Sequence, residues 1–137
     1  MSDRSPTPDQ LALYERACAV RERAYVPYSQ FPVGAVLVAE DGRVFEGVNV
    51  ENGSYGLTIC AERTACVKAV SEGATRFSVI AVSTHDSART ASPCGACRQF
   101  LSEFGLDLIV VYRREGEVVA EPLSALLPAA FELRSPG

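Results

Sequence analysis

The sequence predicts an α/β protein, a three-layer α/β/α fold in which helices cover both faces of a five-stranded mixed sheet. Segments with apolar residues at helical spacing alternate with short apolar runs, in the order α-β-β-α-β-α-β-β. An Asp-Gly turn joins the first two runs as an antiparallel hairpin, whereas a helix separates two later runs, as a parallel pair requires. The 137 residues fit a single domain over 1–137, with tails at 1–7 and 133–137 that we expect to fray.

The first half of the chain is expected to form a helix and a hairpin. A helix over Pro8–Ala24 is predicted because Thr7 and the residues after it carry a capping box with proline at the first helical position. The apolar run Val33–Ala39 predicts a buried strand. Asp41-Gly42 then turns the chain into a second strand over Val44–Glu51.

The second half is expected to alternate helices with strands. One helix is predicted over Cys60–Val70 and another over Cys94–Phe104, and Gly73 and Gly105 follow them, as glycine commonly follows helix ends. The remaining elements are three strands and a short last helix, predicted at 77–83, 108–112, 118–120 and 123–127.

Composition and charge argue against several classes of function. The formal net charge is −4, whereas general nucleic-acid binders carry a basic patch. The N-terminus, MSDRSPTPDQ, lacks the apolar core of a signal peptide, and no apolar run approaches the roughly twenty residues of a membrane span. We therefore expect a cytoplasmic protein with no nucleic-acid or membrane partner. In that compartment the five cysteines are expected to be thiols, catalytic groups or metal ligands rather than disulfides.

Three of the cysteines have the arrangement of a metal site. Cys94 and Cys97 lie three residues apart at a helix start, where both sulfurs can reach one point. Cys60 opens the other helix, and helix N-termini favour the thiolate form that binds metals. Three protein ligands leave one position of a zinc ion open, which is the arrangement of catalytic zinc. Glu62, in the first turn after Cys60, can then reach a water at that position and move protons.

These motifs resemble a known family. Cys60-Ala61-Glu62 together with Pro93-Cys94-x-x-Cys97 matches the signature of the zinc nucleoside and nucleobase deaminases. A cysteine instead of a histidine in the first ligand position is similar to the small homotetrameric cytidine deaminases. The stretches FPVGA, GVNVEN, SYGLTICAERTA and SPCGACRQF also match, so the resemblance covers most of residues 8–131.

The resemblance implies a fold, a reaction and an assembly. It implies a cytidine-deaminase-like fold and zinc-dependent hydrolytic deamination of cytidine and deoxycytidine to uridine and deoxyuridine, as in pyrimidine salvage. One Zn²⁺ per chain activates a water for attack on C4 of the pyrimidine, and Glu62 transfers the protons. The implied partners are a small-molecule nucleoside and further copies of the chain, in a homotetramer with shared active sites. Tyr55 and Phe131 match aromatics that reach a neighbouring subunit's site, and Ala61 matches a residue at the substrate.

The resemblance also assigns roles along the stretch GVNVEN. Its alternation places Val48 and Val50 toward the core. Asn49 and Glu51 share the opposite face, which by itself predicts contact with solvent. The resemblance instead assigns Asn49 and Glu51 to the ribose hydroxyls, and it assigns Phe31 to packing on the base.

Arg63 is expected to tune the metal. Three thiolates on Zn²⁺ carry a formal charge of 2 − 3 = −1, so the metal should be a weaker Lewis acid than one with a histidine ligand. Hydrogen bonds to ligand sulfurs withdraw electron density and restore that acidity. We expect Arg63 to donate such bonds to one or more of the three ligand sulfurs, with Cys94 and Cys97 favoured.

Two alternatives remain open at this point. A thiol-disulfide module would use Cys94 and Cys97, because CGAC also resembles a redox motif, but it leaves Cys60 and Glu62 without a role. A deaminase of another aminopyrimidine, such as blasticidin S, would use the same metal site. His85, the only histidine, is expected to be exposed and not a ligand.

Overall fold

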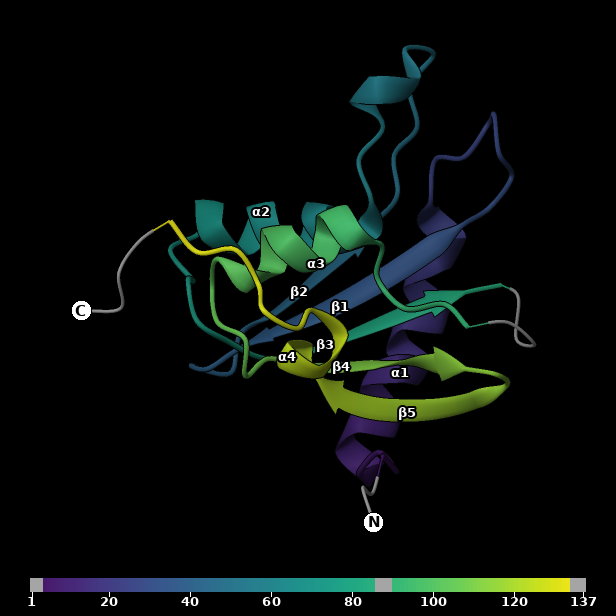
Figure 1. Cartoon of the computed structure of the whole chain (residues 1–137). Helices are drawn as coiled ribbons and strands as arrows, with labels where there is room; N and C mark the ends of the chain where they lie inside the picture. The colour runs from purple at the N-terminus through teal and green to yellow at the C-terminus, as the bar shows by residue number, and fades with distance from the viewer. Residues whose placement is uncertain (1–3, 86–89, 134–137) are drawn as a thin grey trace.

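The computed structural model describes residues 4–85 and 90–133. Helices and single 3₁₀ turns occupy α1 (Pro8–Val20), η1 (Arg21–Arg23), η2 (Tyr55–Leu57), α2 (Ala61–Ser71), α3 (Gly95–Ser102) and α4 (Leu123–Leu126) (Figure 1). Strands occupy β1 (Val33–Ala39), β2 (Val44–Val48), β3 (Phe77–Thr84), β4 (Ile109–Arg114) and β5 (Glu117–Pro122). The predicted order of elements is confirmed, and η2 is an addition that the sequence did not predict. No helix in these two described ranges is both long and apolar enough to cross a membrane.

The five strands form one mixed sheet in the order β2-β1-β3-β4-β5. Strand β1 pairs antiparallel with β2 and with β3, and β4 pairs antiparallel with β5. The pair β3–β4 is parallel, and α3 lies in the connection between these two strands. The prediction of a hairpin followed by a parallel crossover is therefore confirmed.

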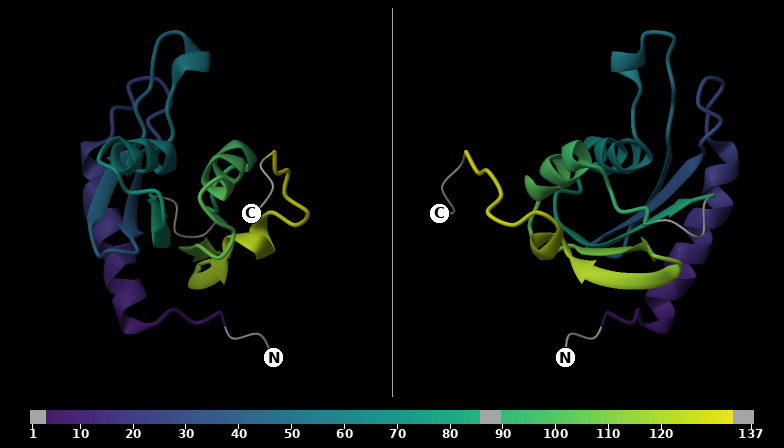
Figure 2. Two further views of the ribbon diagram at one scale, coloured as in Figure 1. Left: turned by 90° about the vertical axis from the view of Figure 1, so that its left-hand side faces the viewer. Right: turned by 45° about the vertical axis from the view of Figure 1, so that its right-hand side comes forward.

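Helices cover both faces of the sheet. On one face α1 packs its buried Tyr14 and Ala17 against Val36 and Ala81 of the central strands. On the other face α2 and α3 lie side by side over the larger cluster, which includes Leu37, Ile80, Val110, Ala65 and Leu101. Figure 2 shows α1 on one side of the sheet and the pair α2–α3 on the other. The three-layer α/β/α prediction is thereby confirmed.

The approach of α2 to the sheet depends on a glycine in the edge strand. A Cβ atom on Gly47 would lie 2.5 Å from the carbonyl oxygen of Ala61 and 2.5 Å from the amide nitrogen of Ala65. Such distances are far inside normal van der Waals contact, so the missing side chain lets the helix backbone rest on the strand. This contact sets the position of the first turn of α2, where Cys60 and Glu62 lie.

The second strand is shorter than the sequence predicted, and its last valine is not in the core. Strand β2 ends at Val48, and Val50 is 41% exposed. The backbone of Val50 instead exchanges two hydrogen bonds with Ile59. The chain between them therefore leaves the sheet and projects as an arm, residues 50–59, which Figure 1 shows above the body of the protein.

Part of the predicted N-terminal tail is held in place. The carbonyl of Arg4 accepts a 2.8 Å hydrogen bond from the amide of Ala120 in β5, and Thr7 caps α1 as predicted. Residues 4–7 are thus tied to the sheet edge and to the helix start. Positions 1–3 and 134–137 lie outside the described residues.

Candidate active site

Three cysteine sulfurs meet where two helices begin. Cys60 is the N-cap of α2 and Cys94 is the N-cap of α3, both with extended backbone, and Cys97 lies in the first turn of α3. The three Sγ atoms all lie within 4.8 Å of one another. All five cysteines of the chain fall in the described ranges and are free thiols, so Cys94 and Cys97 are not joined by a disulfide.

The cluster fits a metal ion. Sulfurs around a tetrahedral zinc lie about 3.8 Å apart, given Zn–S bonds of about 2.3 Å, so only a small closure is needed. Thiolates are soft ligands of the kind that zinc prefers. Within the part of the chain that the structure describes, no fourth Cys, His, Asp or Glu joins the group. Three ligands leave one position for a water or substrate.

The thiols are coupled to one another before a metal binds. A hydrogen bond from the Cys97 thiol is the main cause that lowers the pKa of Cys60 to about 5, and Arg63 adds to the effect. The same pairing, together with burial, raises the pKa of Cys97. Cys97 and Arg63 thus favour the thiolate form of Cys60. A thiolate is the form that takes up a metal.

Glu62 is a buried carboxyl beside this cluster. Its side chain lies in the first turn of α2 and the residue is only 5% exposed. Burial is the main cause that raises the pKa of Glu62 to about 7. Residues two apart in a regular helix do not face each other, but Cys60 is the extended cap outside the helix, which brings both groups to one site. A carboxyl with this pKa can both take and give a proton near neutral pH.

Arg63 contacts the cluster at the sulfur of Cys60. Its Nη2 donates to the Sγ of Cys60 at 3.4 Å, three residues earlier in the chain. A donor to a ligand sulfur was expected, and the bond is made to Cys60 rather than to the favoured Cys94 or Cys97 because Cys60 lies one turn away on the same helix. The Cys60 sulfur is the main cause that raises the pKa of Arg63, and Cys97 adds to it. The buried Nε of Arg63 has no hydrogen-bond partner among the described residues, so part of this guanidinium still has a donor to offer.

A cavity of about 440 Å³ opens beside the cluster, a size within the range of small-molecule sites. It brings together six of the predicted site residues, which are Phe31, Asn49, Cys60, Ala61, Glu62 and Cys94. Among the described residues that line it, none is Arg or Lys. The cavity therefore combines an apolar wall, a buried carboxyl and thiols without a built-in cation.

Asn49 and Glu51 hold the loop that carries Phe31. The side chain of Asn49 accepts from the amide of Val33 and donates to the carbonyl of Phe31, both at 2.9 Å. The Glu51 carboxylate accepts from the amides of Tyr28 and Ser29 and from the Ser29 hydroxyl. Asn49 also lines the cavity, whereas Glu51 lies behind the loop and is not among the residues that line it.

Tyr55 and Phe131 lie away from the cavity of their own chain. Tyr55 is on the projecting arm and is 74% exposed, with its ring edge against Tyr28. Phe131 is in the C-terminal segment, residues 127–133, and is 68% exposed. The structure of one chain thus does not bring these two aromatics to the predicted site.

Several residues that line the cavity were not predicted from the sequence. They include Thr58, Val82, Thr84, Thr90 and Ser92. Alternation along β3 could have indicated Val82 and Thr84, because they share a face with the core residue Ile80. The loop residues carry no such periodic signal. His85 is exposed as predicted, yet its ring packs edge-on against Phe31 with centroids 4.8 Å apart.

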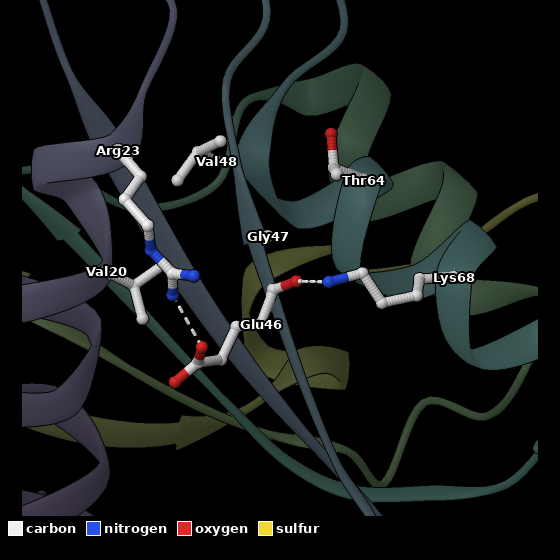
Figure 3. A pocket seen from close by; sticks show the side chains of 7 residues that line it. All are labelled: Val20, Arg23, Glu46, Gly47, Val48, Thr64 and Lys68. Atoms are coloured by element: carbon white, nitrogen blue, oxygen red, sulfur yellow. Dashed lines mark hydrogen bonds and ion pairs between the residues drawn. The ribbon is translucent and has the colours of Figure 1, made fainter.

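A second, smaller cavity of about 120 Å³ lies between α1, β2 and α2. Figure 3 shows Arg23 and Lys68 reaching Glu46 from its two sides. Arg23 pairs with the Glu46 carboxylate at 2.6 Å, as does Arg16, and the Lys68 ammonium donates to the Glu46 carbonyl. These charged groups already bind one another, so this cavity is a structural junction and not the candidate site.

Comparisons with known proteins agree with this geometry. A sequence model of the cytidine and deoxycytidylate deaminase zinc-binding region matches residues 7–113. A cytidine deaminase from Sporosarcina psychrophila is 50% identical over 113 residues, which are 81% of this chain and 82% of the relative. A crystal structure of cytidine deaminase from Burkholderia pseudomallei is 48% identical with a TM-score of 0.83, and the match covers 92% of this chain and 100% of that chain. A blasticidin-S deaminase from Bacillus cereus is 31% identical over 106 residues, which are 72% of this chain and 76% of the relative.

The similarity spans both motifs that bear cysteines as well as the sheet between them. It favours a deaminase over a thiol-disulfide module, and the higher identities are to cytidine deaminases. Zinc is the cofactor of the matched region, and the three-thiol cluster is suited to one zinc per chain. The chain therefore belongs to the zinc-binding cytidine and deoxycytidylate deaminase family.

Proposed function

We propose that this protein catalyses the hydrolytic deamination of cytidine and deoxycytidine, with water as co-substrate and uridine or deoxyuridine plus ammonia as products. The observation that carries the proposal is the buried carboxyl of Glu62 beside three converging thiols, in a cavity of about 440 Å³. The similarity to cytidine deaminases supports the choice of substrate. We place the activity in the cytoplasm, in pyrimidine salvage.

The chemistry divides between the metal and one side chain. Cys60, Cys94 and Cys97 would hold the zinc, which when bound lowers the pKa of a water and makes it a nucleophile at neutral pH. Glu62 accepts a proton from that water and donates one to N3 of the pyrimidine. It then takes the remaining proton from the hydroxyl that has bonded to C4 and passes that proton to the amino group, which leaves as ammonia as the C4–O double bond forms. A carboxyl whose pKa is raised by burial is suited to this alternation.

The remaining cavity residues would hold the nucleoside. The Phe31 ring offers an apolar face to the base, and Ala61 offers a backbone N–H at a helix start, where amides lack partners within the helix. Asn49 has a further N–H and lone pair beyond its two bonds to the loop. Glu51 likewise keeps acceptor capacity for a ribose hydroxyl, because a carboxylate can accept about four hydrogen bonds.

The proposed substrate is a nucleoside and not a nucleotide or RNA. A 5′-phosphate requires Arg, Lys or a helix N-terminus for recognition, and the two helix N-termini at this cavity, at Cys60 and Cys94, are assigned to the metal. Among the described residues that line the cavity there is no such cation, and the residues assigned to the sugar include the anionic Glu51. A phosphate would thus approach a site that carries negative charge.

We also propose that the enzyme is a homotetramer with shared active sites. Tyr55 and Phe131 are exposed on projecting parts of the chain, the arm and the C-terminal segment. Large aromatics are seldom left this open without a partner, and they are enriched at interfaces. In the assembly they would complete the cavity of a neighbouring copy.

An ultraviolet assay of cytidine conversion tests the proposal. We expect deamination by the zinc-loaded protein, loss of activity after removal of the metal with a chelator, and recovery on adding zinc back. In the same assay deoxycytidine should be converted, whereas cytidine monophosphate and blasticidin S should not be converted efficiently. Conversion of blasticidin S alone, or of the monophosphate as fast as cytidine, would overturn the proposed substrate.

A further inference from the structure

The half-buried side chain of Arg98 in α3 joins three separate parts of the chain. Its Nε donates to the carbonyl of Pro93, its Nη2 donates to the hydroxyl of Ser92, and its Nη1 donates to the carbonyl of Leu126, each at 2.7 Å. A guanidinium holds its donors in one rigid plane, so three short bonds fix the positions of all three acceptors relative to α3.

Two of these bonds are made to the chain just before a metal ligand. We call residues 91–94 the thiol loop. Pro93 is fully buried, so its carbonyl needs a hydrogen-bond partner, and Arg98 supplies one. The backbone amide of Arg98 also donates to the carbonyl of Cys94 at 2.9 Å. The backbone bond to Cys94 is an ordinary helical one, so the position of the Cys94 sulfur depends on the Arg98 side chain through the Pro93 carbonyl and the Ser92 hydroxyl.

The third bond is made to the end of α4. Leu126 is the last residue of the four-residue helix α4, and the carbonyls at a helix end lack partners within the helix. Residues 127–133, here called the C-terminal segment, follow directly and run beside α3 (Figure 1). The next residue of α3, Gln99, donates through Nε2 to the carbonyl of Phe131 at 3.2 Å. Two neighbouring residues of α3 thus hold both the start and the aromatic end of this segment.

We propose that Arg98 is a positioning residue that couples metal binding to the order of the C-terminal segment. Zinc would fix Cys94 and with it the thiol loop, which keeps the guanidinium of Arg98 in the orientation that also binds Leu126. Coupling of this kind is reciprocal in binding free energy, so an ordered C-terminal segment tightens zinc binding by the same factor by which bound zinc favours the ordered segment. If Phe131 reaches a neighbouring cavity, the metal site of one subunit is thereby linked to the pocket of the next.

Two measurements test the coupling without any deamination assay, so their outcome is independent of the proposed function. The first is the rate of zinc release to a chromogenic chelator, and the second is amide hydrogen exchange over residues 127–131. In the unchanged protein, removal of zinc should speed exchange in this segment by about tenfold or more, while exchange in the central strands is unchanged. Arg98→Ala should release zinc about tenfold faster, at the lower end of the range for residues that support metal ligands.

The decisive result is whether the effect of zinc removal on hydrogen exchange depends on the Arg98 side chain. In Arg98→Ala the segment should exchange fast with or without zinc, so zinc removal adds little. Arg98→Lys keeps the charge but offers a single ammonium for three acceptors, so it should show a smaller effect of the same kind. This variant replaces Arg98→Ala in the test if the alanine variant does not fold. Gln99→Ala should speed exchange near Phe131 and leave zinc release unchanged. Arg113→Lys, on β4, is the matched control and should alter neither rate.

Three outcomes would overturn the proposal. The first is exchange over 127–131 that does not respond to zinc in the unchanged protein. The second is zinc release from both Arg98 variants at the original rate. The third is faster zinc release from Gln99→Ala equal to that from Arg98→Ala, because the link would then not run through Arg98. Sedimentation of each variant ensures that the comparison is made at one state of assembly.

Discussion

At the scale of single residues, the candidate site depends on where each side chain stands relative to a helix start. Cys60 and Glu62 are two positions apart, and in a regular helix they would face different directions. Cys60 is the extended cap, with φ −72° and ψ 154°, whereas Glu62 is already in the first turn. This change of backbone conformation between neighbours brings a ligand thiol and a buried carboxyl to one cavity.

Arg63 illustrates what residue types alone could and could not predict. Charge arithmetic on three thiolates required a donor to sulfur, and that expectation is confirmed. The bond is to Cys60 and not to the favoured Cys94 or Cys97, because the choice of sulfur depends on which rotamer of a long side chain the surrounding helix permits. The roles of Asn49 and Glu51 in holding the Phe31 loop were likewise not predictable, since apart from the Ser29 hydroxyl their partners in 28–33 are backbone groups that leave no signal in the sequence.

We predict that Arg63→Ala loosens the metal and slows the reaction. Loss of the bond to the Cys60 sulfur removes support from a ligand, a change that typically costs about 10–100-fold in metal affinity or activity. Zinc release to a chelator and kcat/KM for cytidine should both be measured. Lys68→Ala, further along α2, is the control and should leave both unchanged. Equal zinc affinity and rate in Arg63→Ala and the unchanged protein would mean that this arginine is only a surface residue.

At the scale of elements, the sequence was most informative where the spacing of apolar residues agrees with the residues that mark turns and helix ends. The order of helices and strands, the Asp-Gly hairpin and the parallel crossover were predicted from such local patterns and are confirmed. The end of β2 was not, because GVNVEN alternates through Val50 although the backbone leaves the sheet after Val48. Pairing of Val50 with Ile59 is a contact between distant residues, and no local period reports it.

Gly47→Ala should destabilise the protein through the contact between β2 and α2. The new Cβ would lie 2.5 Å from two backbone atoms of the helix, which cannot move without shifting Cys60 and Glu62. Overpacking of this kind typically costs about 1–3 kcal/mol. Chemical denaturation measures the free energy of unfolding, and zinc content measures the effect on the site. Gly95→Ala, whose Cβ meets no heavy atom within 4 Å, is the control. A stable, zinc-loaded Gly47→Ala protein would contradict the close approach.

The junction between α1 and β2 should show a pH dependence of defined sign. A hydrogen bond from Arg16 is the main cause that lowers the pKa of Glu46, and Arg23 adds to it. Because the pKa of Glu46 is lower in the folded protein than in the unfolded chain, its pairing with the two arginines stabilises the fold at pH values above the ordinary glutamate pKa. That contribution is lost as pH falls through the lowered value.

Glu46→Gln should therefore lower the free energy of unfolding near neutral pH by no more than about 1 kcal/mol, since the pair is partly exposed. The difference from the unchanged protein should shrink as the pH falls from about 5 toward 3, around the usual glutamate pKa of about 4.3. Denaturation curves across this range provide the measurement. Arg16→Gln should reproduce the same trend, and a difference that grows toward acid would contradict the sign.

At the scale of the whole molecule, the proposed tetramer would complete the substrate site. The cavity of one chain has an apolar wall and a buried carboxyl, but the aromatics of the arm and the C-terminal segment project away from it. The sequence could suggest this only through resemblance, because periodicity describes packing within a chain and not contact between copies. In the proposed tetramer these exposed rings would pack at the cavity of a neighbouring copy.

Complementation between two impaired variants tests the shared site. Phe131→Ala removes an aromatic anchor, a loss that costs about 2 kcal/mol or more at interface hot spots, so we expect at least about a tenfold fall in kcat/KM. Glu62→Gln removes the proton shuttle of its own chain but retains Phe131. When the two variants are mixed and reassembled, activity should reappear in mixed tetramers. A Phe131→Ala protein as active as the unchanged one, or a fully active monomer in sedimentation, would refute the shared site.

The central claim is that Glu62 is the proton shuttle of a zinc-dependent cytidine deamination. The most direct measurement is cytidine turnover by folded, zinc-loaded Glu62→Gln protein in the ultraviolet assay. Glutamine keeps the shape of the side chain but cannot carry the proton, and general acid-base catalysis contributes about 10²- to 10⁴-fold. Because one carboxyl serves three proton transfers, we predict a loss near or beyond the upper end, with zinc and fold retained and the substrate bound at least as tightly as before. Turnover above about a tenth of the original rate in such a protein would contradict the account.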